Sequence, residues 1–440
     1  MTPRPLARWE MDLSICFSRA VGALVLLGLG GVVSGAEARR VNYDETKVGK
    51  DPLPPLMAAS DGSKVETADD WKSKRRGEIL ELFRNHVFGY TPAIGSDLKV
   101  EVTEKKDGAL QGMAVRWLLH LSLPSVPQWE GIDLMVYVPK GLPKPVPVVV
   151  GLSFQGNHAV TTETDVPISK KWMRPGKQEG QVVANRATEK ARGAESSRWP
   201  LKMIMEHGCA LATAYYGDIE PDHADGWKDG LRGAVGLKKV DNEWGAIGAW
   251  AWGLSRMLDA CQQIDGVDAS RAAVIGHSRL GKTSLWAGAQ DERFGIVISN
   301  NSGEGGAAPA RRDFGETTKI ITSAFPHWFC KRYSTYAEPN THLLPVDSHM
   351  LGALAAPRGL YIASAVEDEW ADPKGEFITA REVEPVYRLF GKDGVGVSDQ
   401  PAIDHPVGAQ VRYHVRTGKH DVVDFDWEQY LKFVGALLKP

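Results

Sequence analysis

Six short apolar segments, separated by stretches with helical spacing, occupy the chain after residue 145. They are residues 146–151, 209–215, 272–275, 296–299, 359–363 and 411–415. An amphipathic stretch covers residues 244–264, and further helical patterns follow Ser278 and Lys374. Apolar strands that alternate with helices are typical of a parallel sheet covered on both faces. The sequence therefore predicts an α/β fold with a mostly parallel central sheet sandwiched by helices.

The chain before this region has a different pattern. Apolar residues at helical spacing between Trp71 and Val87 predict a helix. Three stretches with alternating polarity predict antiparallel N-terminal strands at residues 98–102, 114–123 and 132–138. The segment 42–63 lacks periodicity and suits a wrapping arm, and residues 303–350 form a long irregular insertion of a kind that is usually functional or disordered. We expect a single catalytic domain over residues 39–440.

The first 38 residues have the pattern of a secretion signal. Three arginines precede an apolar run at residues 20–33, and a small-x-small pattern ends at Ala38. A membrane anchor is the alternative, but about 14 apolar residues fall short of the roughly 20 that span a bilayer. Cys16 precedes the apolar run, which is the wrong side for lipoprotein processing. We expect cleavage near Ala38, export to the periplasm or the exterior, and no stable membrane insertion.

Charge and cysteine content exclude several classes of protein. The formal net charge is −3 and no block of five basic residues occurs, so the chain lacks the footprint of a nucleic-acid binder. Cys209, Cys261 and Cys330 follow the predicted signal, and three cysteines permit one disulfide at most. Because no Cys or His cluster has zinc spacing, we expect neither a metal nor another cofactor. We expect a monomer.

Residues 272–282 read as a strand, a sharp turn and a helix, with Ser278 at the turn. This is the setting of a nucleophile elbow, which lifts a serine hydroxyl above the edge of the sheet. The usual G-x-S-x-G motif is not met, because Leu280 holds the second glycine position and Gly281 comes one residue later. On the motif alone, a serine that only caps a helix is an equal alternative.

Two further features favour an α/β-hydrolase. Residues 148–158 form an apolar strand that runs into a glycine-containing loop, where such enzymes supply one backbone N–H of the oxyanion hole. The residue after the nucleophile, Arg279, would supply the other. The order of the candidate residues along the chain also fits, because these enzymes place their triad as serine, then acid, then histidine. Here an acidic turn follows the strand at 359–363, and His420 follows the last strand.

His420 is the best candidate for the base. It lies in a loop after a strand, whereas His414 alternates within that strand and His405 precedes it. A histidine at the carboxyl end of a strand can reach the serine hydroxyl. The alternative is an exposed loop histidine. The acid is harder to assign, because Glu367, Asp368 and Glu369 are adjacent and their spacing does not choose among them.

Five motifs at this point resemble those of the bacterial glucuronoyl esterases of carbohydrate esterase family 15. They are RGAESSRWP at 192–200, AYYGD at 214–218, EWGAI at 243–247, GHSRLGK at 276–282 and EDEWADP at 367–373. The resemblance implies an α/β-hydrolase fold and a serine esterase that cleaves the ester between (4-O-methyl-)glucuronic acid of glucuronoxylan and a lignin alcohol. Ser278 would form an acyl-enzyme and His420 would relay protons.

The resemblance also implies roles for four other residues. The Arg279 side chain would stabilise the oxyanion, and Lys282, Glu316 and Trp370 would contact the sugar. Without the resemblance, the last three read as a surface lysine of a helix, a member of a loop salt bridge and a core tryptophan.

One position departs from the family pattern. Many members carry the acid of the triad as a glutamate at a place that falls at Asn300 or Asn301 here, and an amide supplies no charge. Members without that glutamate use an acid two residues before the sugar-binding tryptophan, which favours Asp368 ahead of the alternate acid Glu367. Glu304 lies near the vacant position and stays an alternative. We expect an Asp368 oxygen within about 3.2 Å of a His420 ring nitrogen.

Two other functions remain open. An acetyl-xylan or general carboxylesterase would share the fold, since fold does not determine substrate. A noncatalytic carbohydrate-binding protein would suit the 14 tryptophans, but it would not need the order of serine, acid and histidine.

Overall fold

The computed structural model describes residues 41–143, 145–238 and 240–438. The predicted secretion signal, with Cys16, lies outside these residues. Within the described residues, none of the helices combines the length and the apolar character that a membrane span requires. Cys209, Cys261 and Cys330 are buried free thiols.

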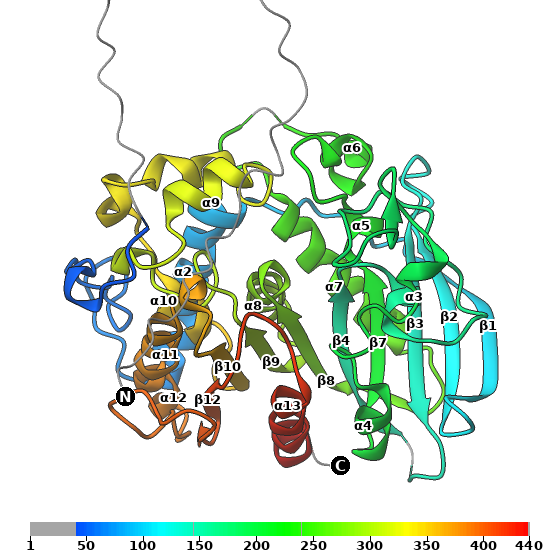
Figure 1. The fold of residues 1–440 in the computed structure, drawn as a ribbon. Helices are drawn as coiled ribbons and strands as arrows, with labels where there is room; N and C mark the ends of the chain where they lie inside the picture. The colour runs from blue at the N-terminus through cyan, green and yellow to red at the C-terminus, as the bar shows by residue number, and fades with distance from the viewer. Residues whose placement is uncertain (1–40, 144, 239, 439–440) are drawn as a thin grey trace, which may run out of the picture. The chain divides into compact units, whose positions relative to one another are not determined.

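A ten-stranded sheet runs across Figure 1 in the order β1-β2-β3-β7-β4-β8-β9-β10-β12-β11. Its strands are β1 (Lys99–Ala109), β2 (Ala114–Ser122), β3 (Ile132–Pro139), β4 (Val146–Ser153), β7 (Ala210–Tyr215), β8 (Val267–His277), β9 (Phe294–Asn300), β10 (Gly359–Ala365), β11 (Val407–Gly408) and β12 (Val411–Arg416). The pairs from β7 through β4, β8, β9 and β10 to β12 are parallel. These six strands contain the six apolar segments, so the predicted parallel sheet is confirmed.

The three predicted N-terminal strands are also present. β1, β2 and β3 pair antiparallel with one another, and β3 joins the parallel strands by pairing antiparallel with β7. A separate two-stranded hairpin consists of β5 (Val182–Val183) and β6 (Arg186–Ala187).

Helices cover both faces of the sheet, as expected (Figure 1). One apolar core lies between the sheet and helices that include α7, α8 and α11, and a second core lies under α4 and α13. The helices are α1 (Ala68–Asp70), α2 (Arg76–Phe83), α3 (Asn157–Val160), α4 (Leu201–Glu206), α5 (Tyr216–Ile219), α6 (Leu231–Val235), α7 (Ala246–Cys261), α8 (Arg279–Gln290), α9 (Thr318–Ala324), α10 (Ser348–Ala353), α11 (Pro373–Glu382), α12 (Glu384–Leu389) and α13 (Asp424–Leu437). Helices that lie on the sheet, such as α7, α8 and α13, bury apolar residues against it, and that burial drives their packing.

The predicted helix near Trp71 is interrupted. α1 and α2 are joined by the π-helical turn η3 (Trp71–Arg75), and a second π-helical turn, η4 (Arg84–Phe88), follows α2. The insertion at 303–350 contains only short helical segments, namely η7 (Ala310–Arg312), α9, η8 (Lys331–Tyr336), η9 (Asn340–Leu343) and the start of α10. The arm before residue 63 packs on this insertion, since Gly49 N donates to Arg312 O at 2.7 Å.

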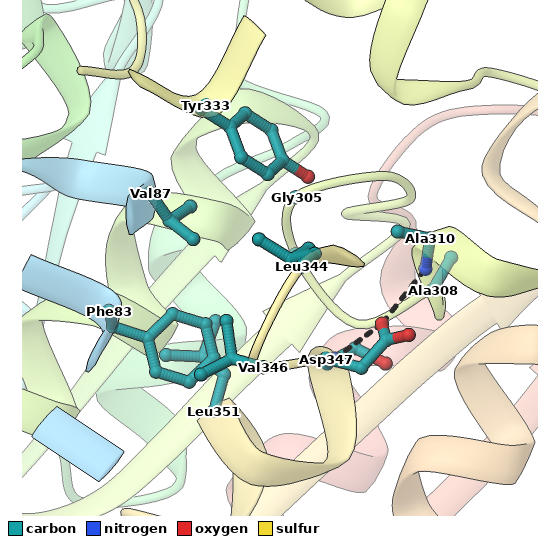
Figure 2. Close-up of a pocket in the computed structure, with 12 residues that line it drawn as sticks. Phe83, Val87, Gly305, Ala308, Ala310, Tyr333, Leu344, Val346, Asp347 and Leu351 are labelled. Atoms are coloured by element: carbon teal, nitrogen blue, oxygen red, sulfur yellow. Dashed lines mark hydrogen bonds between the residues drawn. The ribbon is translucent and has the colours of Figure 1, made fainter. Parts of the chain in front are cut away.

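A small apolar cavity lies between η4 and the insertion. Figure 2 shows the side chains of Phe83, Val87 and Leu351 at its wall, together with the carboxylate of Asp347. That carboxylate accepts a hydrogen bond from Ala310 N at 2.9 Å. None of the residues that line this cavity is a predicted site residue.

Candidate active site

Ser278 stands at a strained turn between β8 and α8. Its backbone has φ 57° and ψ −129°, a conformation that non-glycine residues rarely adopt. A Cβ on Gly276 would lie 1.8 Å from Leu280 O, so only glycine permits this turn. Gly281 is the residue that approaches β9, because a Cβ there would lie 3.2 Å from Asn300 O. The glycine that allows α8 to approach β9 closely is therefore Gly281. This explains why Leu280 can occupy the usual glycine position of the motif.

Asp368 and His420 meet beside the carboxyl ends of β10 and β12. His420 Nδ1 donates a hydrogen bond of 2.6 Å to Asp368 Oδ2, so the expected contact is present. The same oxygen accepts a hydrogen bond of 2.8 Å from Asn301 Nδ2. The Asp368 side chain is 4% exposed and the His420 side chain 39%. The carboxylate is therefore held from two sides, while the imidazole edge stays accessible.

His277, which precedes Ser278, packs on His420. The rings of His277 and His420 lie 4.4 Å apart between centroids. Nδ1 of His277 is hydrogen-bonded to Asn300 Oδ1 at 2.7 Å. Burial and the neighbouring His420 lower the pKa of His277 well below its usual range, so this ring is neutral. It therefore packs on His420 without adding a competing charge.

The alternative acids lie elsewhere. Glu367 and Glu369 are exposed. Glu304 is buried, and its Oε1 accepts hydrogen bonds from Thr318 Oγ1 at 2.7 Å and Tyr333 OH at 2.6 Å. Burial raises the pKa of Glu304 to about 8. Of these carboxylates, only that of Asp368 is hydrogen-bonded to His420.

The alternative histidines are held by other partners. His414 is buried and is hydrogen-bonded at 2.8 Å to both Tyr361 OH and Asp426 Oδ1. His405 is exposed and is bonded within its own loop, to Ile403 O at 2.8 Å. Neither is bonded to Asp368.

Two amides of the loop after β4 already have a hydrogen-bond acceptor. The amides of Phe154 and Gln155 both donate to Glu195 Oε2, at 3.0 and 3.1 Å, so these two N–H groups are already engaged. Arg279 is the first residue of α8, where a backbone N–H has no partner within the helix. Its guanidinium also lies here, centred 4.8 Å from the ring of Trp328. The backbone N–H and the guanidinium of Arg279 are therefore candidate donors to an oxyanion formed at Ser278.

Lys282, Glu316 and Trp370 come together near Ser278. Lys282 Nζ lies 3.8 Å from Glu316 Oε2, and their side chains are 4% and 8% exposed. Glu316 N donates to Trp370 O at 3.0 Å, which joins the insertion to the turn that follows Asp368. Burial raises the pKa of Glu316 and lowers that of Lys282, and their mutual attraction offsets only part of each change. Lys282 Nζ also donates a hydrogen bond to Ser302 O. An ammonium has three N–H donors and a carboxylate accepts several hydrogen bonds, so both groups keep capacity for the hydroxyl groups of a polar ligand.

Sequence reasoning missed Asp222. This carboxylate follows β7 and α5, is fully buried, and is bonded to the Arg279 side chain. The only signal in the sequence is a group of acidic residues after a central strand, namely Asp218, Glu220 and Asp222. Nothing in their spacing distinguishes the third from the other two.

Comparison with known proteins decides the family. Carbohydrate esterase MZ0003, from an unknown prokaryotic organism, is 41% identical over 403 residues, which are 90% of this chain and 92% of that protein. The solved structure of a glucuronoyl esterase from Solibacter usitatus is 46% identical, covers 89% of this chain and 99% of that chain, and has a TM-score of 0.84. The chain belongs to the glucuronoyl esterases of carbohydrate esterase family 15.

Two other matches agree with this family assignment. A family model described as fungal glucuronyl esterase matches residues 228–391, which include the elbow and the acidic turn. A solved structure described as a promiscuous family 15 esterase from a marine bacterial metagenome is 40% identical, covers 90% of this chain and 100% of that chain, and has a TM-score of 0.85. The protein is thus a carboxylic ester hydrolase with an α/β-hydrolase fold, as the resemblance implied.

Proposed function

We propose that this family 15 esterase hydrolyses the ester between the carboxyl group of a glucuronic acid on xylan, plain or 4-O-methylated, and a lignin alcohol. The observation that carries the proposal is the buried Lys282–Glu316 pair, one helical turn from Ser278 and bonded through Glu316 to the backbone of Trp370. A general esterase has no need of two buried charges beside its nucleophile. Hydroxyl groups of a sugar would satisfy their remaining hydrogen bonds.

We infer that the reaction follows the mechanism of a serine esterase. Ser278 Oγ attacks the uronate carbonyl and gives its proton to His420 Nε2, because Nδ1 is held by Asp368. The backbone N–H and guanidinium of Arg279 stabilise the oxyanion of the tetrahedral intermediate. His420 then protonates the departing alcohol, which leaves a glucuronoyl ester on Ser278. Water, activated by His420, releases the uronic acid and restores the serine.

Selectivity among esters tests this proposal. We expect a kcat/KM for benzyl glucuronate at least about tenfold above that for benzyl galacturonate, because the second sugar misplaces one hydroxyl and a lost hydrogen bond to a charged group costs roughly 1.5–3 kcal/mol. Equal rates on these esters and on p-nitrophenyl acetate would indicate a general or acetyl-xylan esterase. Saccharide binding without turnover of any ester would indicate a carbohydrate-binding protein.

The roles of Lys282 and Glu316 can be tested separately. Changing either residue to alanine is expected to lower kcat/KM for benzyl glucuronate by about 10- to 150-fold, which corresponds to the same hydrogen-bond loss. The rate on p-nitrophenyl acetate should change little, since that ester has no sugar hydroxyls. Lys331→Ala, which removes an exposed lysine from the same insertion, is the control. Equal losses on both substrates would mean that the pair serves the fold alone.

A further inference from the structure

One buried carboxylate near the elbow accepts hydrogen bonds from five side chains. The side chain of Asp222 is 0% exposed. Its Oδ1 accepts from His327 Nε2 at 2.9 Å and from Trp328 Nε1 at 2.7 Å. Its Oδ2 accepts from Tyr216 OH and Arg174 Nη1, both at 3.1 Å, and from Arg279 Nη1.

These donors come from four separate parts of the chain. Tyr216 belongs to α5, in the same connection after β7 as Asp222. Arg174 lies in the segment between β4 and β7, and His327 and Trp328 lie in the insertion at 303–350. Arg279 is the residue after the nucleophile. Asp222 therefore joins the elbow to the loops that surround it.

The carboxylate is charged despite its burial. Burial alone would raise the pKa of Asp222, but Arg279, His327 and Arg174 outweigh that effect and hold the pKa far below its usual range. An isolated buried charge would be strongly unfavourable, so these donors are what permit it. In turn, the negative charge restrains the two arginines.

One nitrogen of the Arg279 guanidinium is hydrogen-bonded, and another has no partner within the part of the chain that the structure describes. Nη1 is bonded to Asp222, while Nε is buried and has no hydrogen-bond partner among the described residues. Aromatic rings enclose the guanidinium, with its central carbon 4.8 Å from the Trp328 ring centroid and 5.6 Å from that of Phe325. An arginine fork held in this way leaves donors available for a developing anion.

We propose that Asp222 is a positioning residue that holds the Arg279 guanidinium where it can donate to the oxyanion formed at Ser278. The inference rests on the proposed role of Arg279 in ester hydrolysis, and it requires nothing of the sugar. Because the Phe154 and Gln155 amides are engaged by Glu195, orientation of Arg279 matters more here than in a site with several free amides. A buried residue with a purely structural role would change the free energy of unfolding, but it would have no effect on kcat that depends on Arg279.

A double-mutant cycle on kcat for p-nitrophenyl acetate separates these roles. Removal of one oxyanion donor typically costs about 10²–10³ in kcat, so we expect that loss for Arg279→Ala and about 10- to 100-fold for Asp222→Asn. The double variant should lie within about threefold of Arg279→Ala, because Asp222 then has no guanidinium to position. Multiplicative losses, or a kcat for Asp222→Asn within threefold of wild type, would overturn the proposal.

Glu220→Gln is the matched control. It also changes a buried carboxylate to an amide, two residues away, and it disrupts the ion pair with Arg232, whose Nε lies 2.7 Å from Glu220 Oε2. Thermal unfolding should show loss of stability in both variants, while only Asp222→Asn loses kcat. Comparable kcat losses in both would assign Asp222 a purely structural role.

A second measurement keeps Asp222 intact, in case Asp222→Asn fails to fold. In Arg279→Ala the carboxylate should bind added guanidinium, so millimolar guanidinium chloride should raise kcat at least about threefold with saturation, whereas sodium chloride should not. Absence of this rescue in the folded variant would contradict the proposal. Both experiments use a simple acetate, so failure of glucuronate selectivity would overturn the proposed substrate and leave the test of Asp222 valid.

Discussion

Ser278→Ala and His420→Ala are each expected to lower kcat by about 10⁴-fold or more on any ester that the enzyme hydrolyses. The nucleophile and its base act as a unit, so removal of either costs about as much as removal of both. Neither change should unfold the protein, because Ser278 is only partly buried and His420 is exposed. Steady-state kinetics with benzyl glucuronate, together with thermal unfolding, would measure both effects.

Two comparisons make this test specific. The double variant should be no slower than the slower single variant, since the residual rate comes from the oxyanion donors and from substrate binding. His405→Ala changes an exposed histidine that is bonded within its own loop, and it should leave kcat unchanged. Activity within tenfold of wild type for Ser278→Ala or His420→Ala would exclude the serine mechanism.

Asp368→Asn should have the next largest effect, a loss in kcat of up to about 10⁴-fold. The substitution preserves the shape of the side chain but removes the charge that holds His420 Nδ1–H and stabilises the imidazolium. The wrong tautomer of His420 would then face Ser278. Kinetics with p-nitrophenyl acetate and benzyl glucuronate should show the same loss on both substrates, because Asp368 acts on the base and not on the sugar.

Glu367→Gln and Glu369→Gln are the matched controls for this change. Both remove one negative charge from the same turn, but both side chains are exposed, so the expected loss is below about threefold. A rate near wild type for Asp368→Asn would refute Asp368 as the acid of the triad. The esterase mechanism would survive that result, since Ser278 and His420 are tested independently.

Much of the fold could be predicted because it depends on local patterns. The six apolar segments became the six parallel strands, and the alternating stretches near Ala114 and Ile132 became antiparallel strands. Hydrophobic periodicity indicates which face of a helix or strand is buried, and this periodicity can be read directly from the sequence. The π-helical turns beside α2 were not foreseen, because an extra residue per turn leaves no clear sign in the spacing of apolar residues.

The candidate site was predictable where motif and position agree. Ser278 lies in a distinctive strand–turn–helix segment, and His420 is placed by its position after the last strand. The acid was not determined by spacing, because three adjacent carboxylates occupy one turn. Their directions depend on how that turn packs, and only Asp368 turns inward to Asn301 and His420.

The sequence by itself determined the parallel sheet, the position of the elbow on it and the family motifs, because all three are local or periodic features. The family resemblance favoured Asp368, but spacing left three carboxylates open, and the tertiary structure shows which of them meets His420. It alone revealed that Asp222 is bonded to Arg279. Those pairs are separated by 52 and 57 residues along the chain. Contacts of this kind form only when loops from several strands meet at one edge of the sheet, and no local pattern encodes the direction in which each side chain then points.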